Sequence, residues 1–251
     1  MLFLRSLRKN IWLLFLSTAV FAVVTTIWMP THLIVPPELV GFADYIVDIG
    51  VLLLIIPTAF LLYDNYEIEL GMICGVSTSK LTLSKFFPIL IYTTLPAYLM
   101  IYLYEYLPFT NYNQYKPVIP IYVPERFKIY LFISVTITYF FFASLFLLVR
   151  VTTRSCYLPV VIDLFFYTAF AVLNSQLHDG TADIRMSFFN PFISSSMIGN
   201  VIPNAYAAAG VPHMENLWTW NHLFFLGAAI VLFAVTCVLL RREKLHENAE
   251  E

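Results

Sequence analysis

The sequence predicts an all-α integral membrane protein that has six transmembrane helices, a cytoplasmic helix between the second and third spans, and short external re-entrant helices between the fifth and sixth. Composition is the first reason: 60% of the residues are hydrophobic and 12% are charged, whereas about 25% are charged in a typical soluble domain. The second reason is that six long apolar stretches occur without period-2 alternation, so helices satisfy the backbone polar groups in lipid better than strands would.

Each of the six stretches is long enough to cross a hydrocarbon core of about 30 Å at a helical rise of about 1.5 Å per residue. They cover residues 11–29, 45–63, 86–104, 129–149, 156–173 and 221–240. The predicted cytoplasmic segments are too short to hold a soluble domain. We therefore expect residues 1–251 to form a single transmembrane domain.

The basic residues predict the orientation of the chain, because Lys and Arg concentrate in the cytoplasmic loops of membrane proteins. With the N-terminus inside, ten of the 14 Lys and Arg residues are cytoplasmic and four are external. The cytoplasmic ten are Arg5, Arg8, Lys9, Lys80, Lys85, Arg150, Arg154, Arg241, Arg242 and Lys244. We expect a multi-pass protein of the cell membrane, in a bacterium the inner membrane, with both termini in the cytoplasm.

The external segment of residues 174–220 contains an apolar run from Phe188 to Gly199. This run is too apolar for a solvated loop and too short to cross the membrane. We expect it to form short helices that fold back into the outer leaflet or pack over the bundle.

The most distinctive segment is the cytoplasmic module of residues 64–85, which links spans two and three. Its acidic start, with Glu67 and Glu69, suits the N-terminal turns of a helix. Gly75 is expected to end this helix, and Ser77–Ser79 offers N-caps for a second helix that continues through Lys85 into the third span. The pattern predicts a surface helix and a rigid elbow that passes force from a cytoplasmic contact into the third span. An ordinary interfacial helix without a partner has the same pattern.

The module resembles the corresponding segment in the permease subunits of ABC-2 type transporters. Those proteins carry an acidic residue two positions before a glycine, a short apolar helix, a Ser or Thr cap, and a basic residue before the third span. Here Glu69, Gly71, Ser77–Ser79, Lys80 and Lys85 occupy these places. The six-span layout and the long connection between spans five and six are similar as well.

The resemblance implies an ATP-binding cassette exporter in which this chain forms the translocation pathway. A separately encoded subunit would bind ATP and Mg²⁺ and receive the coupling helix of the module. A second copy of this chain or a related permease would complete the transporter. The residues that the resemblance assigns to coupling and its scaffold are Glu67, Glu69, Gly71, Ser77 and Lys85. The chain has no GxxxxGK[ST] motif, so we expect no cofactor in the chain itself. We also expect no nucleic-acid partner.

Two carboxyl groups fall inside predicted spans. Asp48 lies near the outer end of the second span, and Asp163 lies about a third of the way into the fifth. An ionisable group at such a depth costs about 2.5–3.5 kcal/mol on insertion scales, so each should face protein or water. Either these residues line a transport pathway together with Tyr167 and Thr25, or they form hydrogen bonds that hold helices together, such as one from Tyr167 to Asp163.

The sequence predicts neither a catalytic site nor a metal site. An intramembrane hydrolase would need Asp48 and Asp163 to meet at one depth, yet the topology places them nearer opposite surfaces. The histidines show no ligand spacing such as HExxH. Besides the exporter permease, the sequence is compatible with a membrane sensor or assembly factor that docks a different cytoplasmic partner. The substrate of a permease is left open.

Overall fold

The computed structural model describes residues 2–28, 45–63, 65–103, 125–155, 157–178, 188–192 and 215–250. Helices make up 92% of these residues and no strand occurs among them, so the predicted all-α class is confirmed for this part of the chain. The elements are α1 (Leu2–Lys9), α2 (Ile11–Trp28), η2 (Tyr45–Ile49), η3 (Val51–Ile55), α4 (Ile56–Leu62), α5 (Asn65–Ile73), α6 (Thr78–Leu103), α7 (Glu125–Thr153), α8 (Leu158–His178) and α10 (Glu215–Glu250).

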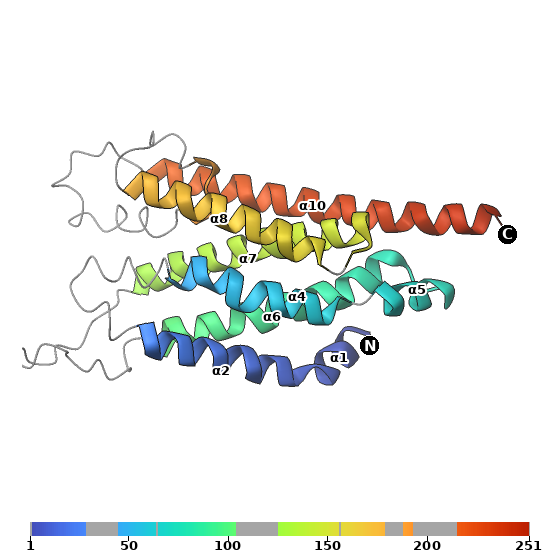
Figure 1. The fold of residues 1–251 in the computed structure, drawn as a ribbon, viewed down its shortest axis with the longest axis horizontal. Helices are drawn as coiled ribbons and strands as arrows, with labels where there is room; N and C mark the ends of the chain where they lie inside the picture. The colour runs from blue at the N-terminus through green and yellow to red at the C-terminus, as the bar shows by residue number, and fades with distance from the viewer. Residues whose placement is uncertain are drawn as a thin grey trace, which may run out of the picture.

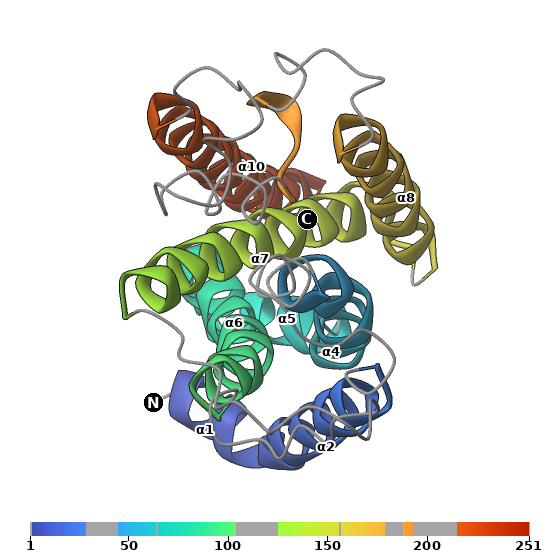
Figure 2. The ribbon, with the colours of Figure 1, turned by 90° about the vertical axis from the view of Figure 1, so that its left-hand side faces the viewer.

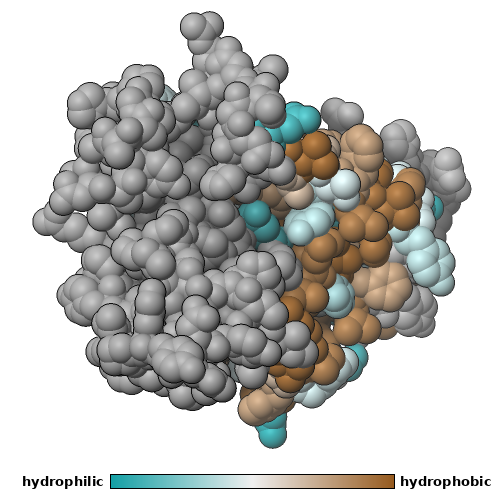
Figure 3. Space-filling model, turned by 60° about the vertical axis from the view of Figure 1, so that its left-hand side comes forward, coloured by the Kyte–Doolittle hydropathy of each residue, from teal (hydrophilic) through white to brown (hydrophobic). Residues whose placement is uncertain are grey.

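Within the described residues, three helices are long and apolar enough to cross a membrane. They are represented by the segments Lys80–Tyr102, Lys128–Thr153 and Thr219–Arg241. Three further apolar segments, Ile11–Val24, Ile46–Leu62 and Leu158–Leu173, are shorter. On the face drawn in Figure 3, the described side chains form a largely hydrophobic band. These features support a membrane protein, and the count of six spans stays a prediction.

Helix α7 lies at the centre of the bundle, where it contacts α4, α6, α8 and α10. In Figure 2 it crosses the middle of the molecule, with α8 and α10 on one side and α2, α4 and α6 on the other. Its apolar segment is 67% buried, whereas that of α10 is 22% buried. The core is therefore built around α7, and α10 leaves most of its apolar surface uncovered by the described protein.

The helices run side by side along the long axis of the molecule (Figure 1). Helices α1 and α5 and the C-terminal turns of α10 lie at one end, which we call the α5 end. The short segment of residues 188–192 lies toward the other end, which we call the turn end. Both ends of the described chain thus lie at the α5 end (Figure 1).

The second predicted span is helical, but it begins with two π-helical segments, η2 and η3. The Tyr139 hydroxyl of α7 donates a hydrogen bond to the Ile46 carbonyl at 2.7 Å. A Cβ atom at Gly50 would lie 1.5 Å from the Tyr139 hydroxyl oxygen, so glycine lets this span approach α7 closely. Regular α-helix begins again at α4, whose first turn contains Pro57. Proline is tolerated in the first turn of a helix although it lacks a backbone N–H.

Candidate functional site

The predicted cytoplasmic module corresponds to α5, a turn, and the start of α6. Gly75 follows α5 with a φ of +79°, a left-handed conformation that favours glycine. Its N–H donates to the Met72 carbonyl at 2.9 Å, and the Val76 N–H donates to the Gly71 carbonyl at 3.0 Å. This pair of bonds is a Schellman motif, which satisfies the last carbonyls of a helix. Helix α6 begins at Thr78, so α5 and α6 form the elbow that the sequence predicts.

Gly71 determines how closely α5 packs against α6. A Cβ atom at this position would lie 2.5 Å from Cδ2 and 2.9 Å from Cδ1 of Leu81. Leu81 is only 6% exposed, so its side chain has little room to move away. The glycine that carries part of the family resemblance is therefore a packing residue that fixes α5 against the start of α6.

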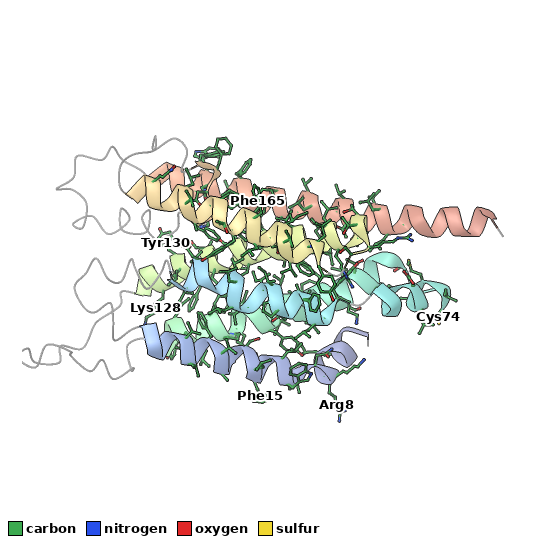
Figure 4. All side chains as sticks on the ribbon, viewed as in Figure 1. Arg8, Phe15, Cys74, Lys128, Tyr130 and Phe165 are labelled. Carbon is green, nitrogen blue, oxygen red and sulfur yellow. The ribbon has the colours of Figure 1, made fainter. Side chains whose placement is uncertain are left out.

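The outward face of α5 combines a carboxylate with apolar side chains. Glu69 is exposed, Leu70 is 47% exposed and Ile73 is 81% exposed. Cys74 is exposed just after the helix, and Figure 4 shows it at the α5 end of the bundle. Large exposed apolar side chains next to a charged one form a surface suited to a partner protein or to the membrane interface. We call these four residues the α5 face.

The remaining module residues have different environments. Ser77 is exposed, and its carbonyl accepts a hydrogen bond from the Leu81 N–H at 3.1 Å, so it occupies the N-cap position of α6. Lys85 is only 8% exposed, which suits a scaffold for the module and not a surface contact. The side chain of Glu67 lies outside the described residues.

Asp163 lies fully inside the bundle, at 0% exposure. Neither of its carboxylate oxygens has a hydrogen-bond partner within the described part of the chain. The hydrogen bond from Tyr167 that the sequence suggested is therefore not formed there, and neither is a hydrogen-bonded carboxyl pair with Asp48. A carboxyl group held in this way is costly to bury, and an ionisable residue in a membrane-spanning helix is a candidate functional residue.

Three of the four residues predicted as pathway candidates lie on neighbouring elements. Tyr167 is one turn from Asp163 on the same face of α8, and its ring packs edge-on against Phe192 with the centroids 5.6 Å apart. Asp48 in η2 is half-buried and close enough to Tyr167 to interact with it electrostatically. Tyr167 thus lies between Asp48 of the second predicted span and Phe192, and Asp163 lies one helical turn from Tyr167 within α8. The side chain of Thr25 lies outside the described residues.

A polar network at the turn end was not anticipated from the sequence. The Asn221 amide of α10 donates to the carbonyls of Phe188 and Asn190, at 2.9 Å each. The Thr138 hydroxyl of α7 donates to the Pro191 carbonyl at 2.9 Å. The segment of residues 188–192 is therefore tied to both α7 and α10, and three of its backbone carbonyls accept hydrogen bonds from side chains of these helices.

Aromatic packing supports the same segment. Phe192 is 0% exposed and stacks on Phe142 of α7 with the centroids 5.5 Å apart. Residues 190–192 are buried in the bundle, whereas Phe189 is 54% exposed. The rest of the predicted external helices lies outside the described residues. The sequence signal for this network was the pair of adjacent polar residues Asn221 and His222 inside an apolar stretch. His222 is hydrogen-bonded as well, with its Nε2 atom 2.7 Å from Oγ of Ser134.

Among the described residues, no three His, Cys, Asp or Glu side chains form a group that could hold a metal ion. No protein-family model, curated protein or solved structure matches the chain. Composition, the α5–α6 elbow and the buried carboxyl group therefore carry the argument about function.

Proposed function

We propose that this chain is the permease subunit of an ABC-2 type ATP-binding cassette exporter. The observation that carries this proposal is the α5–α6 elbow. Helix α5, whose outward face is acidic and apolar, packs closely on α6 at Gly71 and is joined to it by the hydrogen-bonded turn at Gly75. Helix α6 is long enough to cross the membrane. A separately encoded subunit would bind ATP and Mg²⁺ and would contact the α5 face.

The elbow gives a physical route for coupling. Helix α5 follows the second predicted span and precedes the third, so a displacement of α5 acts on both. The contact between Gly71 and Leu81 and the bonds around Gly75 resist rotation of α5 relative to α6. Closure of the ATP-binding subunits would then move the third span together with α5 instead of bending the link between them.

The translocation pathway is assigned to the region of Asp48, Tyr167 and Asp163. The π-helical turns beside Asp48 support this assignment, because such turns are frequent at functional sites. We propose six spans, with α5 and both termini in the cytoplasm, in the cell membrane of a bacterium. A second copy of this chain or a related permease would complete the pathway.

A membrane sensor or assembly factor is the second candidate. The exposed Leu70 and Ile73 side chains favour a docked partner, but nothing in their chemistry requires that partner to be an ATPase. The two candidates differ in the identity of the protein that contacts the α5 face.

Site-specific crosslinking from Cys74 tests the proposal. In a chain whose Cys156 and Cys237 are replaced by Ala, a photoactivated crosslinker on Cys74 should capture an ATP-binding subunit in native membranes. The matched control carries Cys74→Ala and Phe165→Cys, because Phe165 is 67% exposed on α8 and lies away from the α5 end (Figure 4). Repeated capture of a protein without ATPase motifs would favour the sensor. If the crosslinker on Cys74 captures no protein that the control does not also capture, the α5 face does not dock a partner.

A further inference from the structure

Helix α1 is a separate, basic element at the α5 end. It covers Leu2–Lys9 and carries Arg8 and Lys9 in its last turn. Asn10 interrupts the helix before α2 begins, and α1 turns away from the axis of α2 (Figures 1 and 2). A short helix of this kind, with basic and apolar residues on different faces, is typical of the membrane interface.

One face of α1 is fixed to the bundle. The Tyr92 hydroxyl of α6 donates a hydrogen bond to the Leu7 carbonyl, and Leu7 is half-buried against the core. Helix α1 also packs along α6. These contacts fix the orientation of α1 about its own axis. They therefore determine which of its side chains face away from the bundle.

The exposed face of α1 is cationic with an apolar border. Arg8 and Lys9 are exposed, and Leu4, one turn before Arg8, is 63% exposed. On the adjoining turns of α2, Trp12 is 50% exposed and Phe15 is 69% exposed. Figure 4 shows Arg8 and Phe15 extending away from the bundle on the same side. Cations thus lie at the end of a continuous apolar surface.

We propose that α1 and the first turns of α2 bind an anionic phospholipid. The lipid phosphate would contact Arg8 and Lys9, and the acyl chains would lie along Trp12 and Phe15. The charge of the surface selects an anionic over a zwitterionic headgroup, because each exposed cation near a membrane surface attracts anionic lipid. This inference concerns the membrane environment of the chain and does not depend on the exporter proposal.

The test titrates the delipidated full chain, in mild detergent, with phosphatidylglycerol or phosphatidylcholine and counts bound lipids by native mass spectrometry. The native chain should prefer phosphatidylglycerol. The double variant Arg8→Gln, Lys9→Gln should bind it roughly 30-fold more weakly, at about 1 kcal/mol for each cation. The control variant Arg154→Gln, Arg241→Gln removes the same charge from exposed positions and should keep the preference.

The native chain supplies a second arm that requires no variant. Raising the salt concentration from about 0.01 M to about 1 M shortens the screening length from about 30 Å to about 3 Å, so the preference for phosphatidylglycerol should disappear. Equal binding of the two lipids by the native chain at low salt would overturn the proposal. So would an equal loss of preference in the α1 variant and the control variant.

Discussion

A Cβ atom at Gly71 would lie 2.5 Å from Cδ2 of Leu81, so the absence of a side chain at Gly71 allows α5 to rest on the start of α6. Leu81 is buried, and the turn that joins the two helices is closed by backbone bonds on both sides of Gly75. The elbow therefore behaves as one packed unit that continues into a membrane-length helix. The coupling role proposed for this chain depends on that stiffness.

Gly71→Ala tests the packing of the elbow. The added methyl group must displace Leu81 or α5, and such overpacking typically costs about 1–3 kcal/mol of unfolding free energy. Gly227→Ala is the matched control, because a Cβ atom there meets nothing within 4 Å and alanine favours a helix by about 1 kcal/mol over glycine. Thermal unfolding in detergent should show a lower midpoint for Gly71→Ala only. Equal midpoints for the two variants would contradict the close packing.

Gly50→Ala should destabilise the bundle more severely than Gly71→Ala. Its Cβ atom would lie 1.5 Å from the Tyr139 hydroxyl oxygen, and Tyr139 is fully buried, so the second span must move away from α7. Tyr139→Leu removes both the hydroxyl oxygen and the ring carbon Cζ, which would lie 2.5 Å from the added methyl group, and should partly restore the folded yield when combined with Gly50→Ala. The yield of monodisperse protein in gel filtration measures both effects. Additive losses in the double variant, instead of rescue, would contradict the predicted contact.

The sequence predicted the helices but not their winding or their long-range contacts. Apolar length located the three membrane-length helices of the described residues, and Gly75 marked the end of α5, because both signals are local. The π-helical start of the second span is hydrogen-bonded to Tyr139 of α7, which is distant in sequence. The burial of Lys85 and the bonds from Asn221 to residues 188–192 likewise follow from tertiary packing. No periodicity within a single segment carries that information.

Asp163→Cys distinguishes a pathway residue from a packing residue. In a chain without other cysteines, a water-soluble maleimide should modify this cysteine faster when the proposed ATP-binding subunit hydrolyses ATP, because the proposed pathway would then open to water. Phe146→Cys in α7 is the control, since Phe146 is also buried but belongs to the apolar core. If Asp163→Cys reacts as slowly as Phe146→Cys in both states, Asp163 does not line a pathway.

Asn221→Leu should loosen the segment of residues 188–192. The substitution removes two hydrogen bonds and leaves buried carbonyl groups without these donors, at about 1–3 kcal/mol for each unsatisfied group. Thr236→Val is the control, because the buried Thr236 hydroxyl donates to the Leu232 carbonyl of its own helix at 2.9 Å and does not hold the 188–192 segment. Hydrogen exchange should accelerate in the segment around Phe192 for Asn221→Leu and stay unchanged for Thr236→Val. Unchanged exchange in both variants would show that Asn221 does not anchor the segment.

The central claim is that the α5 face docks an ATP-binding subunit, and affinity purification from native membranes tests it most directly. Mass spectrometry of the native chain purified in mild detergent should find a stoichiometric ATP-binding subunit. Glu67→Lys with Glu69→Lys should remove that subunit, whereas the same change at Glu243 and Glu247 in α10 should retain it. Repeated purification of the folded native chain without an ATPase, or an ATPase retained by the Glu67 and Glu69 variant, would contradict the claim.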